Sequence, residues 1–246
     1  MVERNAGHAG RVAIITGGTG EIGRAVAARL LDFRVRVHVL DINTPGDRSD
    51  RYAPVFHTVD VTNERRVEAV FDDIARDEGG IDYLIYCAGI FRPCAVIDLT
   101  RDELARTIAI NLSGAFLCCR AAIRVMRTRR FGRIVLLSSL IARVGTVNGA
   151  HYAASKGGLL GLARSLALEV EEEGIRINTV SPGVVDTAMP RAHSSDEKLA
   201  EVGRAIPLQR IARVDDVAEA CLFLLDEDSA SLTGQDLSVN GGAVLW

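Results

Sequence analysis

The sequence predicts a single α/β domain in which a parallel sheet is flanked by helices. Short runs rich in β-branched residues alternate along the chain with longer amphipathic stretches, and this order is typical of βαβ units. A length of 246 residues suits one large domain, whereas two domains would each be small. We find no internal repeat, low-complexity tract or Pro/Gly/Ser-rich linker that would divide the chain.

The strands are predicted from short apolar runs, at residues 12–16, 35–41, 81–87, 134–138 and 175–180. Helices are predicted where apolar residues recur at helical spacing, at residues 23–31, 64–76, 103–129, 153–172 and 215–225. Residues 187–213 are polar and punctuated by proline. Their composition suits a mobile lid over a pocket and an ordinary surface insertion equally well.

Composition excludes several classes of function. The net charge of −3 provides no basic field for nucleic acid or for an anionic membrane. The first ten residues have no apolar core, and the longest apolar stretch, residues 108–126, is interrupted by Asn111, Arg120 and Arg124. We therefore expect a soluble, cytoplasmic protein. The five cysteines lack Cys-x-x-Cys spacing and partner histidines, so they are interpreted as reduced thiols, and no metal site is expected.

A tyrosine and a lysine four residues apart, Tyr152 and Lys156, provide the clearest chemical signal. The chain has only two lysines, the other being Lys198, against 27 arginines, so this position is expected to require a lysine. An ammonium is a compact point charge, whereas guanidinium is a planar fork. On a helix the two side chains share one face, and a nearby cation should lower the pKa of the phenol towards neutrality, where a general acid/base works best. A surface tyrosine beside a solvated lysine is the alternative.

A glycine-rich loop follows the first predicted strand and precedes the first helix, with Gly17, Gly20 and Gly23 around Thr19, Glu21 and Ile22. Glycines in this context let backbone amides approach a pyrophosphate at the amino end of a helix. Asp41 closes the second strand 18 residues after Gly23, where a carboxylate would accept hydrogen bonds from an adenosine ribose. A turn residue at a strand end is the alternative for Asp41.

Through these motifs the chain resembles a short-chain dehydrogenase/reductase of the single-domain type, from Arg11 to Gly242. The further motifs that carry the resemblance are Asp60-Val61, Cys87-Ala88-Gly89, Asn111, Ser138-Ser139, Ser181-Pro182-Gly183 and Leu232-Thr233-Gly234-Gln235. It implies a Rossmann-type doubly wound parallel sheet flanked by helices. Residues 1–10 would form a flexible amino-terminal segment and residues 11–246 the catalytic domain, with a substrate lid at about 187–213.

The resemblance also implies roles for individual residues. Tyr152 would be the general acid/base, Ser139 would bind the substrate oxygen, Lys156 would hold the nicotinamide ribose, and Asn111 would bend its helix and hold a water against Lys156. The implied cofactor-binding set is Gly17, Thr19, Gly20, Glu21, Ile22, Gly23, Asp41, Ile42, Asp60, Val61, Cys87, Ala88, Gly89, Tyr152, Lys156, Pro182, Gly183, Val185 and Thr187. The implied substrate-binding set is Ser139, Arg143, His151, Tyr152 and Met189.

Two residues depart from the family pattern. The single-domain type usually has glycine where Glu21 stands, and a carboxylate close to a pyrophosphate is repulsive unless it turns outward or meets a cation such as Arg24. Cys87 stands where the family usually has asparagine, so one polar contact beside the cofactor is expected to be missing.

The predicted reaction is hydride transfer between a nicotinamide and a secondary alcohol or ketone of a free small molecule. Asp41 favours NAD over NADP, because a carboxylate would repel a 2′-phosphate. The alternative substrate is a 3-oxoacyl group on an acidic carrier protein, which Arg129 and Arg130 would suit but the acidic run at residues 171–173 would disfavour. A non-catalytic dinucleotide-binding redox sensor is a remote alternative. A homotetramer, or failing that a dimer, is expected, with no nucleic-acid or membrane partner.

Overall fold

The computed structural model describes residues 7–44 and 53–245, which form one α/β domain around a parallel sheet. The seven strands are β1 (Val12–Thr16), β2 (Arg36–Asp41), β3 (Val55–Thr58), β4 (Tyr83–Tyr86), β5 (Gly132–Leu137), β6 (Ile175–Pro182) and β7 (Asp236–Val239). Their order across the sheet is β3-β2-β1-β4-β5-β6-β7, and every pairing is parallel. The predicted fold class is confirmed, although β3 and β7 were not predicted.

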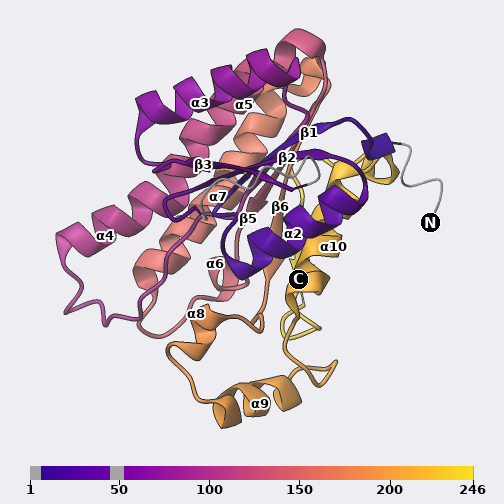
Figure 1. The fold of residues 1–246 in the computed structure, drawn as a ribbon. Coiled ribbons are helices and arrows are strands. Elements are labelled where there is room, and N and C mark those ends of the chain that lie inside the picture. The colour runs from indigo at the N-terminus through magenta and orange to yellow at the C-terminus, as the bar shows by residue number, and fades with distance from the viewer. Residues whose placement is uncertain (1–6, 45–52, 246) are drawn as a thin grey trace.

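Helices cover both faces of the sheet (Figure 1). The longer ones are α2 (Glu21–Asp32), α3 (Glu64–Glu78), α4 (Arg101–Ile108), α5 (Gly114–Arg129), α7 (Ala150–Glu169), α9 (Asp196–Ala205) and α10 (Val214–Leu225). Short turns of helix are α6 (Ile141–Val144), α8 (Ala188–Arg191), η2 (Glu171–Glu173) and η3 (Glu227–Ser229). One apolar core lies under α3, α5 and α7, and a second lies under α2 and α10. Because both faces are covered, β1, β4 and β5 are buried along their whole length and are mostly apolar, with Thr16 and Arg133 as polar exceptions at strand ends.

A π-helical turn, η1 (Ala109–Ser113), joins α4 to α5 in one continuous helix. By length and composition alone, Arg101–Arg129 is long and apolar enough to cross a membrane. In the fold its apolar residues serve the core instead: Ala115, Cys118 and Met126 are fully buried against the sheet. Arg120 and Arg124 on its outer side pair with carboxylates of α3. This is therefore a core helix with a polar outer face.

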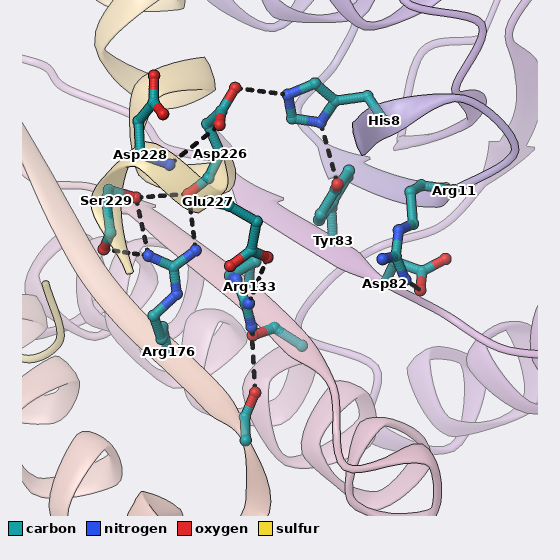
Figure 2. A network of polar contacts seen from close by, with 12 residues as sticks. His8, Arg11, Asp82, Tyr83, Arg133, Arg176, Asp226, Glu227, Asp228 and Ser229 are labelled. Carbon is teal, nitrogen blue, oxygen red and sulfur yellow. Dashed lines mark hydrogen bonds and ion pairs between the residues drawn. The ribbon is translucent and has the colours of Figure 1, made fainter. Parts of the chain in front are cut away.

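A polar network ties the amino ends of the strands together, at the end of the sheet away from the glycine loop (Figure 2). Arg176 of β6 donates to the main-chain carbonyls of Asp226 and Ser229, and Arg133 of β5 pairs with Glu227. His8 is also buried in this network, where it meets Tyr83 at 3.0 Å and Asp226 at 3.3 Å. Of the segment 1–10 predicted to be flexible, residues 1–6 lie outside the described part, and His8 is held in place by these contacts.

Residues 187–213, which we call the lid segment, lie beyond the carboxyl ends of the strands (Figure 1). The predicted irregular stretch contains two helices, α8 and α9, which its proline-punctuated sequence did not reveal. A bridge between Val185 and Ala212 closes the neck of the segment. Leu199 and Ile206 are buried, and Ile206 lies close to Gly241 in the carboxyl-terminal part of the chain.

Candidate active site

The glycine loop connects β1 to α2 at the carboxyl edge of the sheet. Gly17 has φ +63°, and a Cβ at this position would lie 2.7 Å from the main chain of Ala88. Only glycine therefore fits between the first and fourth strands here. Gly20 caps α2 without any side-chain hydrogen bond, which leaves the first N–H groups of α2 available for an anion.

A cavity of about 580 Å³ opens in front of this loop. Most of the predicted cofactor residues line it: Gly17, Thr19, Gly20, Glu21, Ile22, Gly23, Asp41, Ile42, Asp60, Val61, Cys87, Ala88, Gly89 and Thr187. Met189, predicted to bind substrate, also lines it, whereas Tyr152, Lys156, Pro182, Gly183 and Val185 are not among its lining residues. The volume, the glycine cradle and the uncapped helix end fit a dinucleotide.

Sequence reasoning missed several residues of this cavity, namely Leu40, Asn43, Val59, Thr62, Ile90, Arg106, Ala109 and Ile110. Most are apolar neighbours of predicted positions, and their proximity to Asp41, Asp60 and Gly89 was the signal that could have found them. Arg106 is different, because it is the one cation among the described lining residues. It comes from α4, five residues before Asn111, and no sequence motif pointed to it.

Asp41 is held at the cavity by hydrogen bonds to both carboxylate oxygens. One oxygen accepts from the hydroxyl of Thr19 at 2.7 Å and from its backbone N–H at 3.2 Å. The other accepts from the backbone N–H of Asn43 at 3.0 Å. The carboxylate thus joins the end of β2 to the glycine loop. The sequence also has two arginines a few residues after Asp41, Arg48 and Arg51, which are cations that could bind the 2′-phosphate of NADP. Both lie outside the described residues.

Tyr152 and Lys156 lie on α7, and both are buried. The Lys156 ammonium lies 5.7 Å from the centroid of the Tyr152 ring and donates a hydrogen bond to the carbonyl of Leu137 at 2.6 Å. Ser139 follows β5, its hydroxyl accepts a hydrogen bond from the backbone N–H of Ile141 at 3.2 Å, and its side chain lies near the Tyr152 hydroxyl. The serine, the tyrosine and the lysine are thereby brought together from two elements that pack side by side.

Burial controls the protonation of this group. It raises the pKa of Tyr152 to about 12, and the hydrogen bond from Ser139 opposes the rise. It also lowers the pKa of Lys156 to about 8, with the neighbouring Cys87 opposing. The predicted fall of the Tyr152 pKa towards neutrality is therefore wrong for the ligand-free protein. The ammonium is directed at the Leu137 carbonyl, and the cost of removing a phenolate from water dominates.

Asn111 lies in the π-helical turn η1 and is fully buried. Its amide pairs with the main chain of Ile90, accepting from the N–H at 2.9 Å and donating to the carbonyl at 3.0 Å. It also donates to the hydroxyl of Ser155 at 3.0 Å. Gly89 lies between Asn111 and Lys156, because a Cβ there would be 3.5 Å from the Asn111 Oδ1 and 3.4 Å from the Lys156 Nζ. Gly89, a residue of the cavity wall, therefore lies next to both Asn111 and Lys156.

The predicted substrate residues fall into two groups. His151 is buried beside Tyr152, donates from Nε2 to the carbonyl of Arg92 at 3.1 Å, and stacks on Phe91. The centroids of the Phe91 and Tyr152 rings lie 4.7 Å apart, so this aromatic cluster borders Tyr152. Arg143 instead forms an ion pair with the buried carboxylate of Asp236 on β7 at 2.9 Å.

The two departures from the family pattern have different outcomes. Burial raises the pKa of the Cys87 thiol to about 12, so this side chain is a neutral, weakly polar part of the cavity wall. Glu21 lines the cavity, and its carboxylate accepts a hydrogen bond from the backbone N–H of Ala188 in the lid segment.

Together, the glycine cradle and the buried Ser139, Tyr152 and Lys156 define a dinucleotide-dependent oxidoreductase built on a Rossmann-type sheet. The family profile described as "Enoyl-(Acyl carrier protein) reductase" matches residues 18–244. The chain belongs to the short-chain dehydrogenase/reductase family, and its fold implies binding of NAD(P).

Relatives from several organisms support this assignment. The chain is 34% identical to the 3-oxoacyl-[acyl-carrier-protein] reductase FabG of Salmonella typhimurium, covering 95% of this chain and 97% of the relative. It is also 34% identical to carbonyl reductase family member 4 of Xenopus laevis, covering 96% and 98%. Among solved structures, the ligand-free aldohexose dehydrogenase of Thermoplasma acidophilum superposes with a TM-score of 0.91 at 32% identity, covering 96% of this chain and 95% of that one.

Proposed function

We propose that this protein interconverts a secondary alcohol and a ketone on a free small molecule, with NAD(H) as the hydride carrier. The observation that carries the proposal is the pairing of Tyr152 with Lys156, whose ammonium lies next to Gly89 in the wall of a cavity that fits a dinucleotide. A tyrosine within reach of a substrate oxygen serves proton transfer, and a nicotinamide bound in this cavity would supply or accept the hydride.

Each residue of the site has a distinct part in the proposed reaction. Ser139 holds the substrate oxygen against the Tyr152 hydroxyl, which gives or takes the proton. Lys156 is a cation at neutral pH, because its pKa of about 8 still lies above 7. It can therefore stabilise negative charge that develops on the phenol. Asn111 is the positioning residue, since its hydrogen bonds join η1 to Ile90 and to Ser155 on the catalytic helix.

The cofactor preference rests on Asp41. Its carboxylate is fixed at the cavity by Thr19 and Asn43, where it can accept from a free 2′-hydroxyl but would repel a 2′-phosphate. We expect at least a tenfold preference for NAD(H) in kcat/KM, about 1.4 kcal/mol, and a narrower preference in Asp41→Ala. A wild-type enzyme that prefers NADP(H) would contradict this role for Asp41 and direct attention to Arg106.

Reduction of a 3-oxoacyl group on a carrier protein is the second candidate, because relatives at 34% identity carry that name. The basic residues that would receive an acidic carrier are already engaged. Arg129 lies 3.5 Å from Asp82, and Arg130 donates to the carbonyl of Glu172, beside the acidic turn Glu171–Glu173. A free substrate is therefore favoured, and the resemblance to an aldohexose dehydrogenase supports it.

The experiment that separates these functions is a substrate panel in both directions with both cofactors. It should include sugars, simple secondary alcohols and ketones, and a 3-oxoacyl thioester presented free and on a carrier protein. Turnover of free alcohols or ketones supports the proposal, and turnover restricted to the carrier-bound thioester supports the second candidate. No dinucleotide turnover with any member would support the remote alternative of a redox sensor.

We also propose a soluble, cytoplasmic homo-oligomer, a tetramer or failing that a dimer. The oligomer is expected from the sequence because apolar or small residues surround more of α5 and α7 than one sheet face can cover, among them Ala115, Phe116, Gly157, Leu160 and Leu168. Of these, Phe116 and Leu168 are 44% and 73% exposed. Ala115 and Leu160 are buried in the domain itself, so the apolar surface is smaller than predicted. Light scattering that shows only a 26.5 kDa species would overturn the oligomer.

A further inference from the structure

The glycine loop and the lid segment, 167 residues apart in the chain, are joined by one side chain. Glu21 is the first residue of α2, and its carboxylate accepts a hydrogen bond of 2.6 Å from the backbone N–H of Ala188. Ala188 is the first residue of α8, and its N-cap, Thr187, makes no side-chain capping bond. Glu21 therefore satisfies a helix N–H that would otherwise lack a partner within the protein.

This contact attaches α8 to the glycine loop, while other parts of the lid segment have their own contacts: the ring of His193 meets that of Phe91 at 6.1 Å, and the N–H of Leu208 donates to the carbonyl of Gly241 at 3.2 Å. The neck of the segment is closed by the bridge between Val185 and Ala212, with N–H···O bonds of 2.8 and 2.9 Å on either side. Arg191 of α8 pairs with Asp186 and Asp196, each five residues away in the sequence, so these ion pairs do not connect α8 to another part of the fold. Within the described residues, the bond from Glu21 is the only hydrogen bond that connects α8 to the glycine loop.

The contact also has a consequence for the cavity. Glu21, Thr187 and Met189 line it together, so the position of α8 decides where Thr187 and Met189 meet the cavity. Glu21 stands where the family usually has glycine, and a glycine has no side chain with which to make this bond.

We propose that Glu21 is a positioning residue that fastens α8 to the glycine loop and holds Thr187 and Met189 at the cavity before any ligand binds. The inference rests on the proposed function only in naming the cavity a dinucleotide site. The contact itself can be tested without cofactor or substrate, so failure of either idea would be seen separately.

Limited digestion with trypsin in the absence of cofactor is the first test. The lid segment offers cleavage after Arg191, Lys198 and Arg204, and cleavage of a transiently opened segment follows the population of the open form. Glu21→Ala should be cleaved there at least about fivefold faster than wild type, equivalent to about 1 kcal/mol. Glu21→Gln keeps an acceptor oxygen and should remain within about twofold of wild type.

Asp32→Asn is the matched control, because it removes a carboxylate from the far end of the same helix, where the side chain is exposed. It should leave cleavage of the lid segment unchanged. Equal cleavage of Glu21→Ala and wild type would overturn the proposal. Faster cleavage throughout the chain with a lowered Tm would also overturn it, because the role of Glu21 would then be general stability.

Removing the donor gives an independent test. Ala188→Pro lacks the N–H, yet proline is favoured at the first position of a helix, and the extended backbone of Thr187 (φ −145°, ψ 168°) suits a residue before proline. The proposal requires that Ala188→Pro loosen the lid segment as Glu21→Ala does, and that the double variant be no looser than either alone. Hydrogen exchange of the peptide that contains residues 187–191 measures this directly. Additive effects in the double variant would show that the two residues do not act through a common bond.

Discussion

Lys156→Arg preserves the positive charge at residue 156 and changes the shape of the side chain. It therefore tests why this arginine-rich chain has a lysine at the position proposed to support Tyr152. The side chain is 4% exposed, and its Nζ donates to the Leu137 carbonyl at 2.6 Å. Gly89 packs against the same nitrogen, since a Cβ there would be only 3.4 Å away. A guanidinium adds two heavy atoms to this closed space and cannot lose its proton.

Two effects of known size follow from this geometry. Overpacking a buried site costs about 2 kcal/mol, which lowers the Tm of a domain of this size by about 4–8 °C. Displacement of the positive charge from the Tyr152 phenol should lower kcat at least about 10²-fold, equivalent to about 2.7 kcal/mol. Dinucleotide binding should weaken without being abolished, because the glycine loop is untouched.

The assay measures kcat with a substrate identified by the panel, together with thermal unfolding. Lys198→Arg is the matched control, because Lys198 is the other lysine of the chain and lies exposed beside Glu201 at 2.8 Å. An exposed pair of this kind contributes little, so kcat should stay within twofold and the Tm within about 1 °C of wild type. A Lys156→Arg enzyme with more than a tenth of wild-type kcat would refute the requirement for an ammonium.

Three further predictions use other parts of the structure. Tyr152→Phe should lower kcat at least about 10²-fold while dinucleotide still binds, as measured by fluorescence titration, and retention of a tenth of the activity would contradict proton transfer by this phenol. Gly17→Ala should abolish dinucleotide binding and lower the Tm, because its Cβ would lie 2.7 Å from the Ala88 backbone at φ +63°; the control Gly161→Ala has open space around it. Burial lowers the pKa of His38 to about 4, so the stability that neutral His38 provides above pH 6.5 is lost as the pH falls. The free energy of unfolding measured in urea should be on the order of 2 kcal/mol higher at pH 7.5 than at pH 4.5 because of this group, and His38→Gln should show a smaller difference; identical pH dependence in both proteins would reject the prediction.

The His38 prediction depends on two neighbouring histidines at the edge of the sheet, the buried His38 and the partly buried His57. His38 donates from Nε2 to the carboxylate of Glu78 at 3.1 Å, so its Nδ1 accepts from the Nε2 of His57 at 3.0 Å. Burial also lowers the pKa of His57, with Arg66 acting in the same direction. Arg36, Arg66 and Asp73 complete the charged surroundings, and protonation of both histidines would place two cations in contact.

The amino-acid sequence by itself determined the architecture and most of the cofactor site. Strands buried on both faces are continuous apolar runs, and the glycine loop and Asp41 are local in sequence, so periodicity and spacing located them. The edge strands β3 and β7 escaped prediction because they are only partly buried and carry polar residues, so no apolar run marks them. The helices of the lid segment were not predicted because α8 is a single turn and few residues of α9 are buried, so the sequence shows no long apolar pattern there.

Only the tertiary structure decided what depends on contacts between distant residues. It directed Arg143 to Asp236 and Glu21 to Ala188, and it added Arg106 to the cavity. It also reversed the expected shift of the Tyr152 pKa. Spacing along a helix places a lysine near a phenol, but the pKa of that phenol depends on how much water the surrounding chain removes, and this is a property of the whole packed domain.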